Sequence, residues 1–175
     1  TNILHIPWVL GYKLFWFGLF IVLSISSSIY LLKTIFSKSH FWQMILTALI
    51  FTTNTYILMV VGGGQMGVAL AYSIAPLVLA RFIKVIHNSE FIIQNSLLAG
   101  LILAAQVMFD PRIAYMTIIA IAGYYLINKF QIPALPAGRS NFKFQIVSIL
   151  YIFAIPIGIA VLLHSYWIFP LLATR

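Results

Sequence analysis

The side chains that could carry out chemistry in this 175-residue chain are few. Its only acids are Glu90 and Asp110, its four histidines are scattered, and it contains no cysteine. A pair of neighbouring carboxylates for acid–base catalysis is therefore missing, and the histidine spacing fits no metal-ligand pattern. The lack of cysteine excludes disulfides, thiolate metal sites and cysteine nucleophiles. No metal site is predicted, and no catalytic residue can be assigned from spacing.

Asp110 is the more informative acid because Pro111 and Arg112 follow it directly. An aspartate before a proline is typical of a helix N-cap with proline at the first helical position. We expect Asp110 to cap a helix; metal binding or a role as a base is the alternative. Arg112 could pair with a phosphate, since its guanidinium matches phosphate oxygens.

A run of three glycines, Gly62–Gly64, permits a tight reversal of the backbone directly before Gln65. The run is not a phosphate-binding loop, because no Lys-Ser or Lys-Thr pair follows it. Gln65 begins the next apolar segment, where it could meet a ligand beside exposed backbone N–H groups.

A second group of candidate side chains, His164, Tyr166 and Trp167, follows a long apolar segment. The two aromatic side chains could stack on a sugar. Tyrosine and tryptophan are also enriched where helices leave a membrane. Anchoring at that interface is the preferred interpretation of both.

The composition places these residues in a membrane protein. Hydrophobic residues make up 63% of the chain and charged residues 7%, against about 45–50% and about 25% in soluble domains. A soluble domain of this size cannot hide so much apolar surface. The lipid bilayer is the expected partner, and soluble enzymes are excluded. The net charge of +8 reflects scarce acids, so no nucleic-acid partner is expected.

Six segments are long and apolar enough to form transmembrane helices, which need about 20 residues each. We predict an all-α fold, a polytopic integral membrane helical bundle of about six transmembrane helices, as a single domain over residues 1–175. Short loops predict antiparallel neighbours, and the polar stretch Lys129–Lys143 contains an irregular connector at Gln131–Ser140. The segments are about Leu14–Leu32, Phe41–Val61, Met66–Ile86, Phe91–Met108, Arg112–Asn128 and Phe144–His164.

The basic residues predict the orientation of these segments, because cytoplasmic loops are enriched in Lys and Arg. Seven of them fall on one side of an alternating six-span arrangement and three on the other. Both termini are then expected to be extracytoplasmic, together with the Gly62–Gly64 turn and the Asp110 turn, and the plasma membrane is the expected location. The seven are Lys33, Lys38, Arg81, Lys84, Lys129, Arg139 and Lys143, and the three are Lys13, Arg112 and Arg175.

Polar residues inside the segments are predicted to hold helices together, because such groups turn toward other helices in lipid. They include residues 52–55, Gln94, Asn95 and Gln106; a pathway lining is the alternative. Pro76 and Pro156 should each kink a helix.

Two stretches of the chain resemble a known family. One is Gly64-Gln65-Met66-Gly67 through Ala71-Tyr72-Ser73-Ile74-Ala75-Pro76-Leu77, after Asn54-Thr55-Tyr56; the other is Ser165-Tyr166-Trp167-Ile168-Phe169-Pro170. Together they resemble the middle of multi-pass membrane glycosyltransferases of the GT-C type, including arabinofuranosyltransferase-like proteins. The likeness covers about Asn54 to Pro170. It implies a polyprenyl-phosphate sugar donor, extracytoplasmic action and a divalent metal as the cofactor.

The leading hypothesis is therefore a membrane-embedded part of a GT-C-like glycosyltransferase. Residues of the outer loops would border the lipid-linked sugar site. The acidic first outer loop of that family has no counterpart here, so the chain is either a piece of a longer protein or not an enzyme. The alternatives are a non-catalytic membrane subunit with other membrane subunits as partners and, less favoured, a transporter fragment. The bordering residues are Gln65, Asp110, Arg112, His164, Tyr166 and Trp167.

Overall fold

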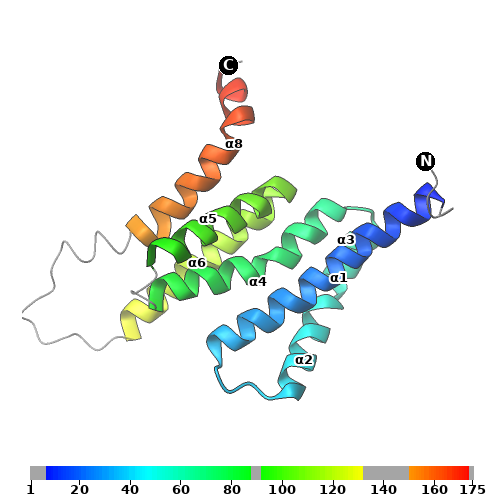
Figure 1. The fold of residues 1–175 in the computed structure, drawn as a ribbon, viewed down its shortest axis with the longest axis horizontal. Coiled ribbons are helices and arrows are strands. Elements are labelled where there is room, and N and C mark those ends of the chain that lie inside the picture. The colour runs from blue at the N-terminus through cyan, green and yellow to red at the C-terminus, as the bar shows by residue number, and fades with distance from the viewer. Residues whose placement is uncertain (1–6, 88–91, 132–149, 174–175) are drawn as a thin grey trace, which may run out of the picture.

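The computed structural model describes residues 7–87, 92–131 and 150–173, and the regular structure in these ranges is helical (Figure 1). This confirms the all-α prediction. Outside the described residues lie Glu90, Arg139, Lys143, Arg175 and most of the predicted connector at 131–140. The helices are α1 (Trp8–Ile35), α2 (Phe41–Thr52), α3 (Thr55–Gly62), α4 (Met66–His87), α5 (Ile92–Phe109), α6 (Pro111–Gln131), the π-helix η1 (Leu150–Ala154) and α8 (Ile155–Ala173).

Three helices are long and apolar enough to cross a membrane: Val9–Ile35 within α1, α4 and α5. The pair α2 and α3 counts as a fourth if it is one span bent by 46°. Helix α6 contains an arginine, three tyrosines and an asparagine, which lower its hydropathy. The segment Leu150–Tyr166 is apolar but shorter. In the described part of the chain, three or four of the six predicted segments thus form helices with the length and apolar composition that a span needs.

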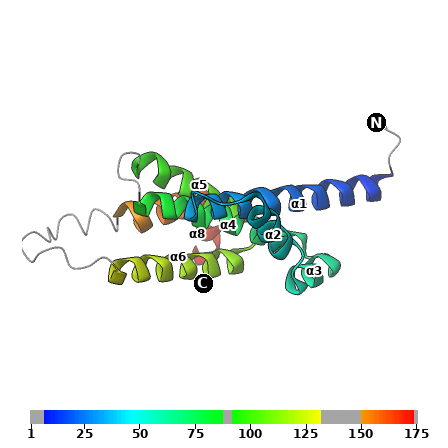
Figure 2. The ribbon, with the colours of Figure 1, turned by 90° about the horizontal axis from the view of Figure 1, so that it is seen from below.

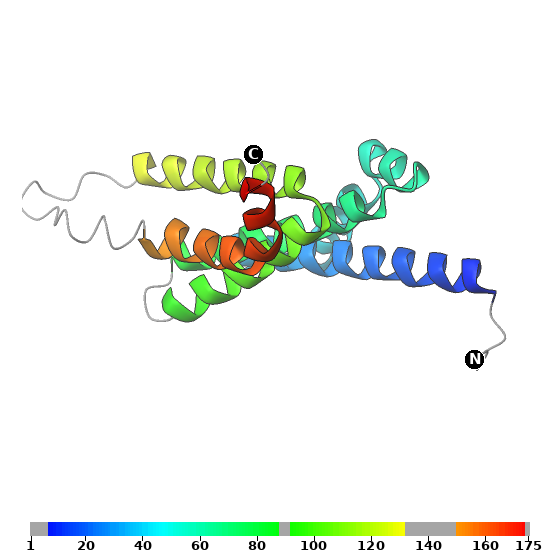
Figure 3. The same ribbon diagram turned by 90° about the horizontal axis from the view of Figure 1, so that it is seen from above.

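Side-chain contacts define the directions of the helices. Gly67 near the start of α4 lies against Phe109 at the end of α5, so these neighbours are antiparallel. Ser27 of α1 contacts Ser73 of α4, and further along the same helices Tyr30 contacts Lys84. Helices α1 and α4 therefore run parallel, as alternating spans require. Figures 2 and 3 show α6 on one side of the layer that α1, α4 and α5 form.

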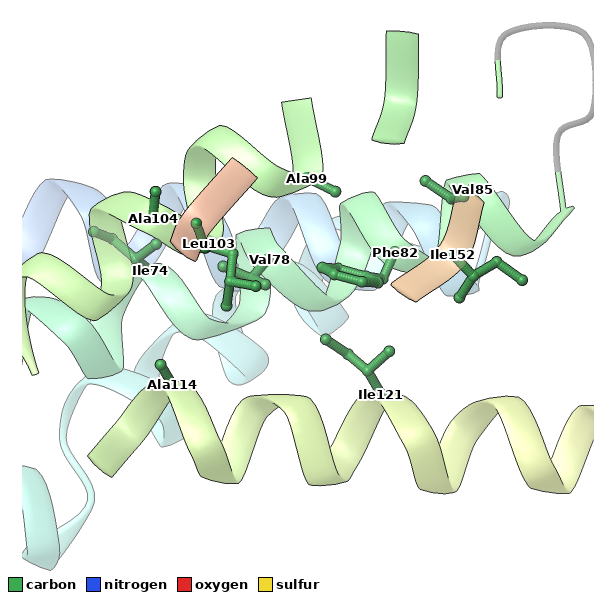
Figure 4. Close-up of a cluster of buried hydrophobic side chains, with 11 residues drawn as sticks. Ile74, Val78, Phe82, Val85, Ala99, Leu103, Ala104, Ala114, Ile121 and Ile152 are labelled. Carbon is green, nitrogen blue, oxygen red and sulfur yellow. The ribbon is translucent and has the colours of Figure 1, made fainter. Parts of the chain in front are cut away.

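Helix α4 supplies the centre of the bundle. Ile74, Val78, Phe82 and Val85 recur every three or four residues and form one buried stripe. Side chains of α5, α6 and η1 pack on this stripe (Figure 4), with Phe82 only 1% exposed. Large apolar residues elsewhere, such as Trp42 at 76%, are exposed. Because lipid is itself apolar, close packing and hydrogen bonds hold such helices together more than burial does.

Candidate functional site

Two turns meet at the end of the bundle where α4 begins and α5 ends. In the glycine turn, Gly64 has a φ of 74°, a conformation that favours glycine. A Cβ placed on Gly67 would lie 3.0 Å from the carbonyl oxygen of Phe109. This close approach brings the glycine turn beside the Asp110 turn. The prediction that both turns share one end of the bundle is confirmed.

Asp110 caps helix α6, as its position before Pro111 predicts. Its Oδ1 accepts a hydrogen bond of 2.8 Å from the backbone N–H of Arg112. That N–H belongs to the first turn of α6 and has no partner within the helix. The predicted N-cap is confirmed.

The same carboxylate forms an ion pair with the Arg112 side chain. Nη2 of Arg112 lies 2.7 Å from Oδ2 of Asp110, and Nε lies 3.2 and 3.3 Å from the two carboxylate oxygens. The Arg112 side chain hydrogen bonds lower the pKa of Asp110 below its ordinary value, against the opposing effect of burial. A carboxylate held in this way is a weaker base. Capping therefore explains Asp110 better than a role as a base does.

Arg112 remains accessible although it is paired. Its side chain is 76% exposed, whereas that of Asp110 is 7% exposed. The contacts with Asp110 use two of the five guanidinium N–H groups, so the others can bind an anion from solvent. Tyr56 of α3 is close enough to interact electrostatically with Arg112. A phosphate is the anion whose geometry this side chain matches best.

A break between α2 and α3 lies beside this site. The side chain of Asn54 accepts a hydrogen bond of 3.1 Å from the backbone N–H of Ile57 and so caps α3. Its Nδ2 donates to the carbonyl of Phe51 at 2.9 Å and to the hydroxyl of Tyr72 at 2.7 Å. The rings of Phe51 and Tyr72 stack 4.4 Å apart. The prediction of one continuous helix over 41–61 is therefore wrong, because Asn54 ends one helix and starts another.

The predicted site residues separate into two groups. Gln65 is exposed in the turn that leads into α4, two residues before Gly67, which lies against Phe109. His164, Tyr166 and Trp167 lie within α8, which continues to Ala173. The prediction that this helix ends at about His164 is therefore wrong, because the segment after His164 stays apolar enough to continue it.

The three residues of α8 differ in their surroundings. His164 is buried, and its Nε2–H donates to the carbonyl of Ala104 at 2.9 Å. Tyr166 is 74% exposed. The side chain of Trp167 lies outside the described residues. The contact of His164 ties α8 to α5 about a turn and a half before Asp110, so His164 has a structural role in this bundle.

Polar contacts between helices confirm part of the packing prediction. Gln106 is fully buried, and its Nε2 donates to the carbonyl of Ala71 at 3.1 Å and to Thr117 at 2.8 Å. Asn95 is also buried. Thr53, Thr55 and Gln94 are exposed, so the prediction fails for those residues.

Carbonyls close to the two helix-interior prolines receive hydroxyl groups from neighbouring helices. Ser27 donates to the carbonyl of Ser73, three residues before Pro76, at 2.6 Å. Ser96 donates to the carbonyl of Tyr151 at 2.8 Å. Sequence reasoning missed both hydroxyl contacts. The signal for Ser96 is its spacing from Gly100, a small-xxx-small pair of the kind that lets helices approach.

A metal site of the kind the family resemblance implies does not fit the described residues. No group of three histidine, aspartate or glutamate side chains that could hold a metal ion occurs in these ranges. Asp110, the one acid they contain, is already held by Arg112. A pocket of about 530 Å³ lies elsewhere, between the end of α1 and the start of α2.

Comparison with protein-family models, with characterised proteins and with solved structures finds no match for this chain. Its function has to be argued from its own residues.

Proposed function

We propose that this chain forms the membrane-embedded part of a GT-C-like glycosyltransferase that uses a polyprenyl-phosphate sugar. The observation that carries the proposal is the hydrogen bond between Asn54 and Tyr72. It joins the stretch around Asn54 to the stretch around Tyr72. The order of these two stretches along the chain resembles that family. Tyr56 of the first stretch lies against Tyr72 of the second, with ring centroids 6.4 Å apart, and is within electrostatic range of the exposed Arg112.

Arg112 is the residue proposed to bind the donor phosphate. Asp110 positions the guanidinium through two hydrogen-bonding nitrogens, which reduces the conformational freedom lost on binding. Gln65, exposed at the start of α4, would contact the sugar. The proposal assigns no catalytic base, since the Asp110 carboxylate is held in an ion pair with Arg112. Asp110 is the one acid among the described residues, so a carboxylate for the transfer step is to be sought outside them.

The proposal includes the finer topology. Six spans would place the site on the extracytoplasmic side of the plasma membrane, with both termini on that side. The bias of Lys and Arg toward the other end of the bundle supports this orientation.

The test is a transfer assay on the full-length gene product in membranes, with polyprenyl-phosphate sugars as donors. Transfer that falls at least about tenfold in Arg112→Gln supports the proposal, because an Arg–phosphate contact contributes about 1.5–3 kcal/mol. Lys13→Gln is the matched control, because Lys13 is an exposed basic residue of α1 on the same predicted side. Absence of transfer, under conditions in which a related enzyme is active, would contradict the proposal.

A second candidate is a non-catalytic subunit of a membrane assembly. The observation in its favour is that Asp110 is used for capping and ion pairing, while Gln106 and His164 bond other helices. Affinity purification from native membranes in a mild detergent tests it. Recovery of a stoichiometric membrane partner supports the subunit, and a stable monomer would count against it.

A further inference from the structure

Two basic side chains of α4 converge on one aromatic ring of α1. Nζ of Lys84 donates a hydrogen bond of 2.8 Å to the hydroxyl of Tyr30 and lies 4.7 Å from the centroid of its ring. The guanidinium carbon of Arg81 lies 5.2 Å from the same centroid. Both distances are within the range of a cation–π interaction. Two positive charges therefore lie against one tyrosine ring.

These two charges repel each other. Arg81 and Lys84 are three residues apart on α4, a spacing that places both on one helical face. Asp110, the acid among the described residues, caps α6 at the opposite end of the bundle; Glu90 lies outside the described residues. The tyrosine ring compensates the charges only in part, so the arrangement favours a bound anion.

Arg81 also has an unused donor. Its Nε is buried and has no hydrogen-bond partner within the described part of the chain. A buried N–H without a partner costs about 1–3 kcal/mol. An anion seated between Arg81 and Lys84 would accept from this N–H and relieve the repulsion at the same time.

The position of the cluster indicates where the anion comes from. The cluster lies near the end at which α1 and α4 both terminate (Figure 1), and both helices are long and apolar enough to span a membrane. The ends of such helices lie at the depth of lipid headgroups, where basic residues bind anionic phosphates.

We propose that Arg81, Lys84 and Tyr30 bind the phosphate of an anionic membrane phospholipid. Arg81 donates from its buried Nε, Lys84 donates from its ammonium group, and Tyr30 keeps the two cations in place. The inference rests on insertion of α1 and α4 in a membrane. It does not depend on glycosyl transfer or on the Arg112 site.

The test is native mass spectrometry of the purified full chain in detergent, titrated with phosphatidylglycerol and separately with phosphatidylcholine. We expect saturable binding of phosphatidylglycerol alone. Arg81→Gln and Lys84→Gln should each weaken it about tenfold, the effect of one charge-assisted hydrogen bond. Lys33→Gln is the matched control, because Lys33 is an exposed lysine in the last turn of α1. It should weaken binding only about twofold, as expected for an exposed charge.

Two further variants separate the roles of the ring and the hydroxyl. Tyr30→Phe keeps the ring and should retain most of the affinity, whereas Tyr30→Leu should lose it. Circular dichroism of each variant verifies the helical content, and Arg81→Lys replaces any glutamine variant that unfolds. Equal losses for Lys33→Gln and Lys84→Gln would indicate diffuse surface charge and overturn the proposal. Displacement of the lipid by inorganic phosphate would assign the site to free phosphate and overturn it as well.

Discussion

The hydroxyl of Ser96 on α5 donates a hydrogen bond of 2.8 Å to the carbonyl oxygen of Tyr151 in η1 and shares it with the carbonyl oxygen of Ile92 in its own helix at 2.7 Å. In a π-helix, a carbonyl pairs with the N–H five residues later. For Tyr151 that residue is Pro156, which has no N–H. A side chain of a different helix thus supplies the donor that proline lacks, as is common where prolines interrupt membrane helices.

We predict that Ser96→Ala lowers the free energy of unfolding by about 1 kcal/mol. Thermal unfolding in detergent, followed by circular dichroism, measures the change. Ser26→Ala is the matched control: Ser26 is exposed and bonds only carbonyls of its own helix. In a Pro156→Ala background, residue 156 regains its N–H and the cost of Ser96→Ala should shrink. An unchanged cost in the double variant would show that the two residues are not coupled.

Gly100 permits the close approach of α5 and α8. A Cβ at this position would lie 2.9 Å from Cδ1 of Ile159 and 3.0 Å from the Cα of Pro156. Because the second contact is with backbone, the helices must separate to relieve it. We predict that Gly100→Ala lowers the free energy of unfolding by about 1–3 kcal/mol, the usual cost of overpacking.

The control for this prediction is Gly123→Ala in α6. No atom lies within 4 Å of a Cβ built on Gly123, so alanine should be neutral or stabilise the helix by up to about 1 kcal/mol. Both variants are compared by the same thermal unfolding measurement. A stable Gly100→Ala protein would show that α8 can move away from α5 at little cost.

Several features of the fold could be predicted from the sequence because they depend on local chemistry. The apolar lengths predict α1, α4 and α5, and the Asp110-Pro111 pair predicts the start of α6. The break at Asn54 was not predicted, although asparagine after two threonines is a common N-cap signal. Residues 41–61 together are apolar enough to be interpreted as one span, and this interpretation left out the break.

The parts of the site that could not be predicted depend on which helix faces meet. Nothing local to Arg81 and Lys84 indicates that Tyr30, more than 50 residues earlier, lies against them. In the same way, the spacing of Ser96 and Gly100 suggests close packing without naming α8 as the partner. Such contacts follow from the tertiary arrangement of helices whose apolar faces all look alike in the sequence.

The break between α2 and α3 depends on Asn54. We predict that Asn54→Ala destabilises α3 by about 1 kcal/mol, the usual cost of losing an N-cap. Amide hydrogen exchange should then become faster at Ile57, whose N–H the Asn54 side chain accepts. Tyr72→Phe removes one partner of Asn54 and keeps the ring stacked on Phe51, so it should have a smaller effect. Equal exchange rates in Asn54→Ala and the parent protein would exclude capping.

The ion pair of Asp110 predicts a pH dependence of stability. The pKa of Asp110 is lower in the folded protein than its ordinary value, mainly because of the Arg112 side chain hydrogen bonds. The pair therefore contributes its full stability above about pH 5, where the unfolded aspartate is also ionised. The contribution is lost as the pH falls through the lowered pKa of the folded state. At low pH, the parent protein should lose this part of its stability.

Two substitutions of Asp110 separate its charge from its cap. Asn is about as good an N-cap as Asp, so Asp110→Asn removes the ion pair and keeps the hydrogen bond to the backbone N–H of Arg112. Its midpoint of thermal unfolding should be lower than that of the parent at pH 7 and should converge with it in acid. Asp110→Ala also loses the cap and should stay less stable by about 1 kcal/mol at every pH. If the curves of the parent and Asp110→Asn run parallel from neutral to acidic pH, Arg112 does not stabilise the folded state through this carboxylate.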